Sequence, residues 1–316
     1  MRRKIIRTLG VAALLLAHAS LGEAAQGPQV RDGHAYEPPG RFDFVKNILP
    51  DNRDFFRMSF RRQALGPVAL VTFSTALLIW KDQELVDEAV RFGDRQRISH
   101  DHDQTGRHGV KIGSQKLEFA YPENWGQAMY FLGDGWLHFG IAGGFLGTGL
   151  ARDDPRALQT ASQMVESILA SGLVVQVLKH ITGHESPFTA EIRGGRWRFF
   201  PNQVDYHKNV AKYDAFPSGH LAAATASVGV IGSTYSEYRL IKPVGYTLLG
   251  LVSYQMMNNG VHWAGDYPLA LALGYGFAKI AVNKGRKKAE EPPSPISLGP
   301  TILPGGGAGL DLRYRF

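Results

Sequence analysis

The chain has 316 residues, 44% of them hydrophobic and 20% charged, which is enough apolar sequence for a folded domain and excludes wholesale disorder. Its formal net charge of +7 suits an anionic substrate or an anionic membrane surface. The basic residues are spread over both ends and a central loop, so we expect no nucleic-acid partner. The absence of cysteine excludes disulfides, thiolate chemistry and Cys-ligated metals.

Residues 1–25 have the pattern of an export leader. Met1–Lys4 supplies positive charge, and Leu9–Ala17 supplies an apolar core that is too short to span a membrane as a helix. Small residues then offer cleavage sites near Ala19 or Ala25, so this segment is expected to be a signal peptide or, alternatively, an uncleaved N-terminal anchor. Residues 26–60, which are rich in Pro, Gly, Arg and Asp, are expected to be an exposed linker.

Residues 61–285 contain a series of apolar segments, and no internal repeat appears among them. Their lengths lie between those of buried core helices and short membrane spans. They predict an all-α fold, a helical bundle of about six core helices with a site at one end. The segments are Ala64–Trp80, Trp136–Leu150, Ser162–Leu178, His220–Ser233, Val244–Met257 and Tyr267–Val282.

Residues 286–316 are expected to be a basic linker and a C-terminal tail. Ala308–Phe316 alternates in polarity and ends in Phe, which resembles the last strand of an outer-membrane barrel. The alternative for this stretch is an edge strand or a frayed tail.

The most informative motif is Pro217–Ser218–Gly219–His220, which precedes an alanine-rich helical run. Ser218 and Gly219 would lie at the N-terminus of that helix, where free backbone N–H groups and the helix dipole attract a phosphate. His220 would then lie in the first helical turn, close enough to protonate a leaving oxygen.

A second pair of residues, His262 and Asp266, follows about forty positions later. At i and i+4 the two side chains would share a face if the segment is helical. A carboxylate in that place can hold one imidazole nitrogen and leave the other free to attack phosphorus. An isolated pair at this spacing would more often be structural, and the preceding Pro-Ser-Gly-His motif favours catalysis.

These segments resemble the three motifs of the type 2 phosphatidic acid phosphatase (PAP2) superfamily, which also includes bacterial acid phosphatases and vanadium haloperoxidases. The first motif is Lys179–Pro187, the second is complete at 217–220, and the third is Gln255–Asp266. The resemblance covers roughly Gln127 to Val282 and implies the same helical core bundle.

The resemblance also implies a role for each matching residue. His262 would be the nucleophile that forms a phosphohistidine, and Asp266 would orient it. His220 would be the general acid and then the base that activates water. Lys179, Ser218 and the Gly219 backbone would stabilise the phosphoryl oxygens.

Two positions depart from the family pattern. Ser186 and Met256 stand where the first and third motifs each have a phosphate-binding arginine. Cationic clamps normally stabilise the charge that spreads over the phosphoryl oxygens, so their loss puts activity in question. One of Arg193, Arg196 and Arg198, with or without His184, is expected to enter the pocket instead. The alternative is that the arginines are solvated loop charges.

The sequence thus predicts a metal-independent, cofactor-independent phosphatase. Vanadate would act on it as an inhibitor or phosphate mimic. It would act on phosphomonoester or diphosphate groups, with phosphorylated membrane lipids preferred over small soluble esters. Basic clusters after the last apolar segment and before the first and fifth favour a membrane-associated protein of the bacterial envelope, with its site facing the periplasm. A periplasmic or outer-membrane-associated protein is the alternative location. The competing functions are a degenerate lipid- or phosphate-binding pseudophosphatase and, less favoured, a vanadate-dependent haloperoxidase.

Overall fold

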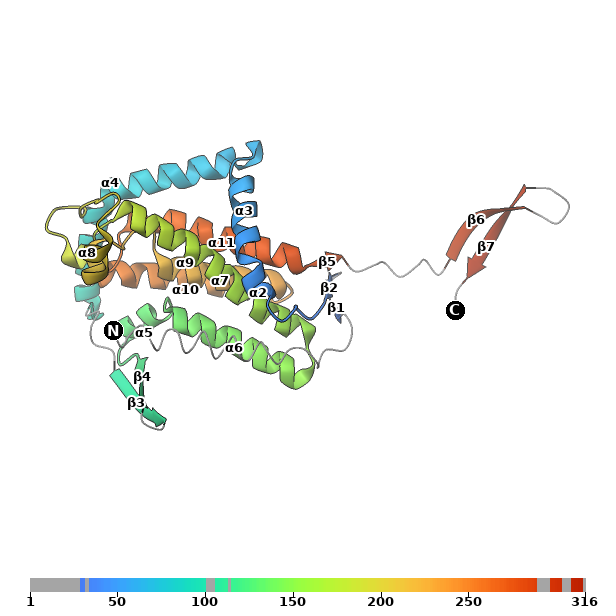
Figure 1. Ribbon diagram of the computed structural model, residues 1–316, viewed down its shortest axis with the longest axis horizontal. Helices are drawn as coiled ribbons and strands as arrows, with labels where there is room; N and C mark the ends of the chain where they lie inside the picture. The colour runs from blue at the N-terminus through green and yellow to red at the C-terminus, as the bar shows by residue number, and fades with distance from the viewer. Residues whose placement is uncertain are drawn as a thin grey trace.

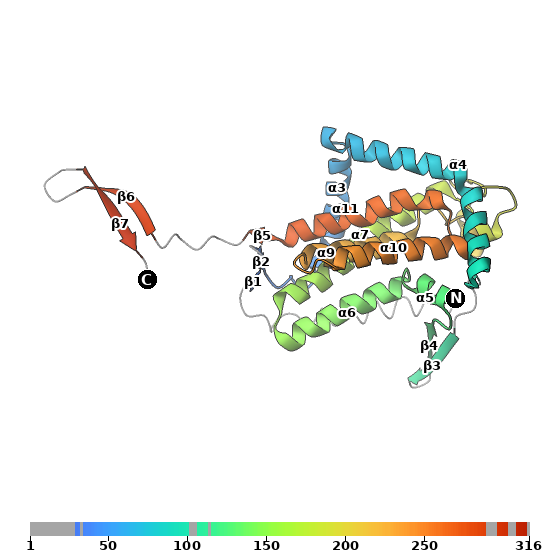
Figure 2. The same ribbon diagram turned by 180° about the vertical axis from the view of Figure 1, so that it is seen from behind.

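The computed structural model describes residues 29–31, 34–100, 106–112, 115–288, 296–302 and 308–314. The expected leader at residues 1–25 lies outside the described residues. The main body is a bundle of long helices (Figures 1 and 2).

Six long helices form this bundle, and each contains one of the apolar segments recognised in the sequence. This confirms the expected all-α fold class. The helices are α4 (Leu65–Gln96), α6 (Gly135–Arg152), α7 (Pro155–Thr182), α9 (Gly219–Thr234), α10 (Ile241–Asn258) and α11 (Tyr267–Gly285).

Shorter elements connect the long helices. The short helices are α2 (Asp43–Lys46), α3 (Ile48–Ser59), α5 (Trp125–Phe131) and α8 (Gln203–Lys208), with 3-10 turns η1 (Arg62–Ala64), η2 (Pro187–Thr189), η3 (Val210–Lys212) and η4 (Ala264–Asp266). The described strands form small antiparallel pairings: β1 (Gln29–Arg31) with β2 (His34–Tyr36) and β2 with β5 (Lys287–Lys288), β3 (Gly106–Ile112) with β4 (Gln115–Tyr121), and β6 (Ile296–Ile302) with β7 (Ala308–Tyr314).

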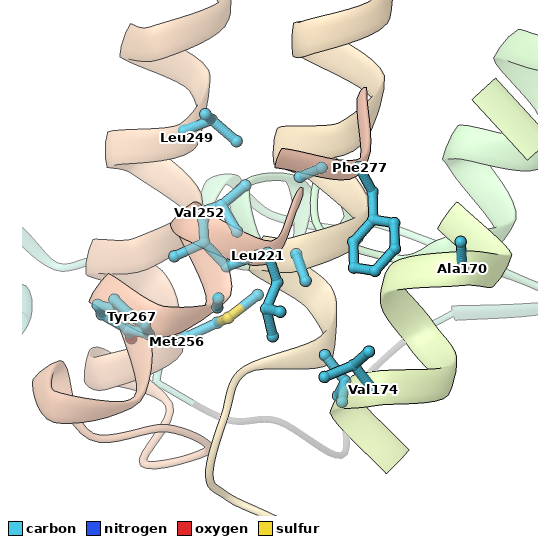
Figure 3. Packing of buried hydrophobic residues seen from close by; sticks show 13 residues of the cluster. Ala170, Val174, Leu221, Leu249, Val252, Met256, Tyr267 and Phe277 are labelled. Carbon is cyan, nitrogen blue, oxygen red and sulfur yellow. The ribbon is translucent and has the colours of Figure 1, made fainter. Parts of the chain in front are cut away.

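The core lies where α9 packs between α7, α10 and α11. Leu221 from α9, Val252 and Met256 from α10 and Phe277 from α11 are almost completely buried there (Figure 3). Full burial of such a side chain contributes about 1.5–3 kcal/mol each. This packing fixes the ends of the helices relative to one another, which is what positions the loops between them.

The expected exposed linker at residues 26–60 is wrong over residues 43–59. Here α2 and α3 pack against α7, and Phe44 is 1% exposed. The fully buried Asp51 on α3 pairs with Lys284 of α11, and Asn47 donates to Glu166 of α7 at 3.0 Å. Charged residues that look solvent-facing in the sequence therefore have partners more than a hundred positions away.

Two helices, α4 and α7, are long and apolar enough to cross a membrane by length and composition. The apolar stretch of α7 is mostly buried in the bundle, whereas that of α4 is not buried. Several large apolar side chains of α4 are therefore exposed, although the helix runs beside α11. They are Leu65, Val68, Leu70, Phe73, Leu77 and Trp80.

Candidate active site

The three motif segments meet at one end of the bundle because of the direction in which the helices run. Helix α7 ends at this end, α9 begins there, and the chain returns along α10 to reach η4 before α11 departs again (Figure 1). Gly183 ends α7 in the left-handed conformation at φ 52°, which glycine adopts more readily than residues with a Cβ atom. The chain can then turn at once into the loop that holds His184.

His262 is held by Asp266, as the sequence predicted, but on a tight turn rather than on one helix face. His262 precedes the 3-10 turn η4, and its Nδ1 lies 3.2 Å from Asp266 Oδ2. The same oxygen accepts the backbone N–H of Trp263 at 2.8 Å. Because the carboxylate accepts the hydrogen bond from Nδ1–H, the lone pair of His262 is on Nε2.

Asp266 is completely buried, yet its ionised form is favoured. Burial by itself raises the pKa of this carboxyl group, but hydrogen bonds from His184 and His262 outweigh burial and lower the pKa to about 2. His184 Nδ1 lies 3.3 Å from the second oxygen, Oδ1. Asp266 therefore serves two histidines, of which the sequence predicted only His262.

His220 lies in the first turn of α9, where the sequence placed it. Its ring centroid is 5.9 Å from that of His262, and the two rings are nearly perpendicular at 72°. This separation allows one tetrahedral phosphoryl group to contact both rings. The hydroxyl group of Tyr130, on α5, lies 3.4 Å from His220 Nε2.

Lys179 supplies a cation beside the N-terminus of α9. It is 6% exposed, and a Cβ atom added to Gly219 would lie 3.9 Å from its Nζ. The ammonium group also lies 3.4 Å from a carboxylate oxygen of Asp214. Lys179 and the backbone around Gly219 are thus arranged to attract an anion.

The hydroxyl group of Ser218 has a different place from the one expected. It is completely buried, caps α9 by accepting the N–H of Leu221 at 3.3 Å, and lies 3.7 Å from Met256 Sδ. Its side chain therefore stabilises the start of the helix, while its backbone N–H donates to the carbonyl oxygen of Asp266 at 3.1 Å.

The expectation that His184 enters the phosphate pocket is wrong. Its side chain is completely buried, and its two ring nitrogens face Asp266 and the carbonyl oxygen of Gly194. The loop folds back there because the N–H of Glu185 donates to the carbonyl oxygen of Arg196, whose own N–H donates to the Glu185 carboxylate. His184 and His262 thus contact different oxygens of the Asp266 carboxylate, and the His184 ring has no exposed surface.

Two of the three loop arginines, Arg196 and Arg198, have partners other than His220 and His262. Arg196 pairs with Glu191 at 3.5 Å, and Arg193 is exposed. Arg198 donates to the carbonyl oxygen of Lys212 and lies 3.4 Å from Glu185. Within the described residues, no recorded contact joins these guanidinium groups to either catalytic ring.

Ser186 and Met256, the two positions that depart from the PAP2 motif pattern, are both buried. Ser186 is 2% exposed and Met256 is completely buried against Ser218. Neither side chain is a cation. Among the residues that the resemblance assigned to the phosphate, Lys179 is the one with a positive charge.

Sequence reasoning missed Asp82, which supports the site from α4. Its carboxylate accepts the N–H of Gly265 at 2.7 Å, one residue before Asp266. The side chain is 1% exposed although it follows an apolar helical stretch directly. Asp82 stands at the start of a charged continuation of α4, so nothing in the local sequence distinguishes it from the exposed carboxylates that follow.

No group of three or more His, Asp or Glu side chains within the described residues is arranged to hold a metal ion.

The model of the PAP2 superfamily matches residues 160–289 of this chain. None of the curated protein sequences compared with the chain matches it. Among solved structures, the chain is similar to the first transmembrane PAP2-type phosphatidylglycerolphosphate phosphatase from Bacillus subtilis. The sequence identity is 12% and the TM-score is 0.41, over 77% of this chain and 96% of that one.

Proposed function

We propose that the protein is a phosphatase of the PAP2 superfamily, whose model matches residues 160–289, and that it hydrolyses phosphomonoester or diphosphate groups through a phosphohistidine on His262. The observation that carries this proposal is the convergence of His220 and His262, with Asp266 fixing the tautomer of the second ring. Lys179 of α7 lies beside the N-terminus of α9, where its positive charge would attract the phosphate.

The proposed reaction uses the Nε2 lone pair of His262 and a proton carried by His220. The Nε2 lone pair of His262 attacks phosphorus, so an N–P bond forms while the P–O bond to the leaving group breaks. His220 gives its proton to the leaving oxygen. Water, deprotonated by His220, then attacks phosphorus and breaks the N–P bond, which returns His262 neutral and releases inorganic phosphate.

We propose that the substrate is carried by a membrane lipid. The exposed apolar face of α4 supports membrane association, because such a surface is costly to leave in water. Helix α4 also contacts η4, so this apolar surface is connected to the catalytic end. A location in the bacterial envelope with the site facing the periplasm goes with this proposal.

Phosphate release from phosphatidate in detergent micelles, compared with para-nitrophenyl phosphate, tests the proposal. Wild-type protein should release phosphate from the lipid and, after a brief exposure to ³²P-labelled substrate, carry acid-labile label. The His262→Ala variant should do neither. Hydrolysis of the soluble ester alone would refute the lipid part, and label retained by the variant would refute the role of His262.

A second candidate function is phosphate or lipid binding without turnover. The observation that favours it is that Ser186 and Met256 are buried and that Arg196 and Arg198 are paired elsewhere. Saturable binding of phosphatidate vesicles with no phosphate release and no labelled protein would support it against the phosphatase.

A further inference from the structure

His184 is a buried histidine next to the reacting groups that the proposed mechanism does not use. It follows directly after Gly183 and has no exposed surface. Its Nδ1 lies 3.3 Å from Asp266 Oδ1, and its Nε2 lies 3.1 Å from the carbonyl oxygen of Gly194. Both ring nitrogens therefore face hydrogen-bond acceptors.

This arrangement is best satisfied by a proton on each nitrogen. A neutral imidazole has one N–H donor and one acceptor nitrogen, so one of the two contacts would set a lone pair against an oxygen. Asp266 is already the acceptor for Trp263 N–H and for His262, so its carboxylate is the natural counterion of a charged ring.

The surroundings of His184 also suit a cation. The ring stacks on Trp197 with centroids 3.8 Å apart and planes 13° apart, and Trp263 lies beyond at 6.1 Å. A charged ring over an indole face is attracted by its negative quadrupole. This stack also keeps water away from the ring.

The charged groups around the ring come from each element packed there. Asp266 belongs to η4 and Asp82 to α4, and both act on His184 electrostatically. From the loop, Glu185 is paired with Arg198, Arg196 is paired with Glu191, and Asp214 is paired with Lys179. Asp266 and Asp82 thus have no Lys or Arg partner among the ion pairs of the described residues. Burial raises the pKa of Asp82, so Asp266, which contacts the ring directly, is the main negative charge beside His184.

We propose that His184 is a positioning residue, held doubly protonated, that shares the carboxylate of Asp266 with His262 and so keeps the nucleophile neutral. A carboxylate that acted on His262 alone would favour the protonated ring, which has no lone pair to attack phosphorus. The positive charge on His184 offsets that effect while Asp266 still fixes the orientation of His262. This inference rests on the proposed function, in which His262 is the nucleophile.

The first test uses ¹⁵N NMR of the histidine rings in the wild-type protein and needs no turnover. At pH 7 His184 should show two protonated nitrogens, and His262 should show one. In His184→Gln, the midpoint for protonation of His262 should rise by about one pH unit. A neutral His184 at pH 7, or an unchanged midpoint for His262, would overturn the inference whether or not the protein proves to be a phosphatase.

The second test is the pH profile of kcat/KM. In His184→Gln the acid limb should move up by about one pH unit, with KM little changed. His184→Arg restores a permanent planar cation that can stack and donate to both oxygens, so it should return the acid limb toward wild type. A decrease in kcat/KM that is the same at every pH and equal in both variants would indicate a purely structural role and would overturn the inference.

His180→Gln is the matched control. His180 lies four residues earlier, bonds to the carbonyl oxygen of Gln176 and stacks on Tyr206, without contacting the reacting groups. Its profile should match wild type. If the wild-type protein hydrolyses no phosphate ester, the proposed function fails, and the NMR midpoints still decide the role of His184.

Discussion

Buried carboxylates lie beside the C-terminal end of α7 and beside its middle, and the two regions satisfy them in different ways. At the C-terminal end, Asp266 is held by two imidazoles and a backbone N–H. Near the middle, about 20 Å away along the helix, Asp51 pairs with Lys284, and Glu166 accepts from Asn47. The first region surrounds its carboxylate with imidazole rings, whereas the second holds Asp51 with an ammonium group and joins α3 to the bundle.

Removal of the proposed nucleophile should break this comparison most completely. His262→Ala should lower phosphate release at least about a thousand-fold, because the imidazole proposed to form the N–P bond is gone. Phosphate release measures the loss of activity, and the thermal midpoint Tm shows whether the variant is still folded. A residual activity within tenfold of wild type would contradict the role of His262.

Removal of Lys284, the cation that pairs with Asp51 near the middle of α7, should lower stability and leave catalysis intact. Lys284→Met leaves the buried Asp51 without its partner, so the free energy of unfolding should fall by about 3 kcal/mol. Chemical denaturation measures it, and kcat per folded molecule should stay at the wild-type value. Lys279→Met, on the exposed side of the same helix, is the control and should change little.

The catalytic end also makes a pH-dependent contribution to stability through Asp266. The pKa of this carboxyl group is about 2 in the folded protein, against 3.8 for an unperturbed aspartate, so the unfolded chain binds the proton more tightly. The stabilisation is therefore full above pH 4 and is lost as the pH falls through about 2. It amounts to about 2 kcal/mol. Measured by urea denaturation between pH 5 and pH 2, the free energy of unfolding should fall more steeply with falling pH for wild type than for Asp266→Asn. Equal dependence on pH in the two proteins would contradict this role of Asp266.

The loop arginines should give the smallest effects. Arg196→Ala removes a surface ion pair with Glu191, so kcat/KM should change less than about twofold. Arg198→Ala should lower it somewhat more, because Arg198 braces Glu185 next to His184. A loss above tenfold in Arg193→Ala, Arg196→Ala or Arg198→Ala would show that the missing family cations are replaced when substrate binds.

The bundle could be predicted from the sequence because each core helix carries its own apolar segment. The end of α4 could not, since the apolar run stops at Trp80 while the helix continues to Gln96. That continuation is charged and carries pairs such as Lys81 with Glu84 and Arg91 with Glu88, which support a helix locally. Helix α3 was missed because its buried Asp51 looks exposed without knowledge of Lys284.

The catalytic residues could be proposed because the second motif is complete and the His-Asp pair follows it in order. The place of His184 could not be read from its neighbours in the chain. It depends on how the loop after α7 folds back so that Trp197 covers the ring and Gly194 accepts from it. Because His184 lies only two residues before Ser186, the sequence suggested that its side chain enters the phosphate pocket. In the structure the ring is instead completely buried against Asp266.

The stacking of His184 on Trp197 has an optical consequence. A protonated imidazole in contact with an indole quenches its fluorescence by accepting an excited electron, and a neutral imidazole does so much less. Emission from Trp197 should thus be dim in the native protein and brighten when the imidazole is replaced by an amide. The fold has placed a chromophore where it can report on the charge beside the active site.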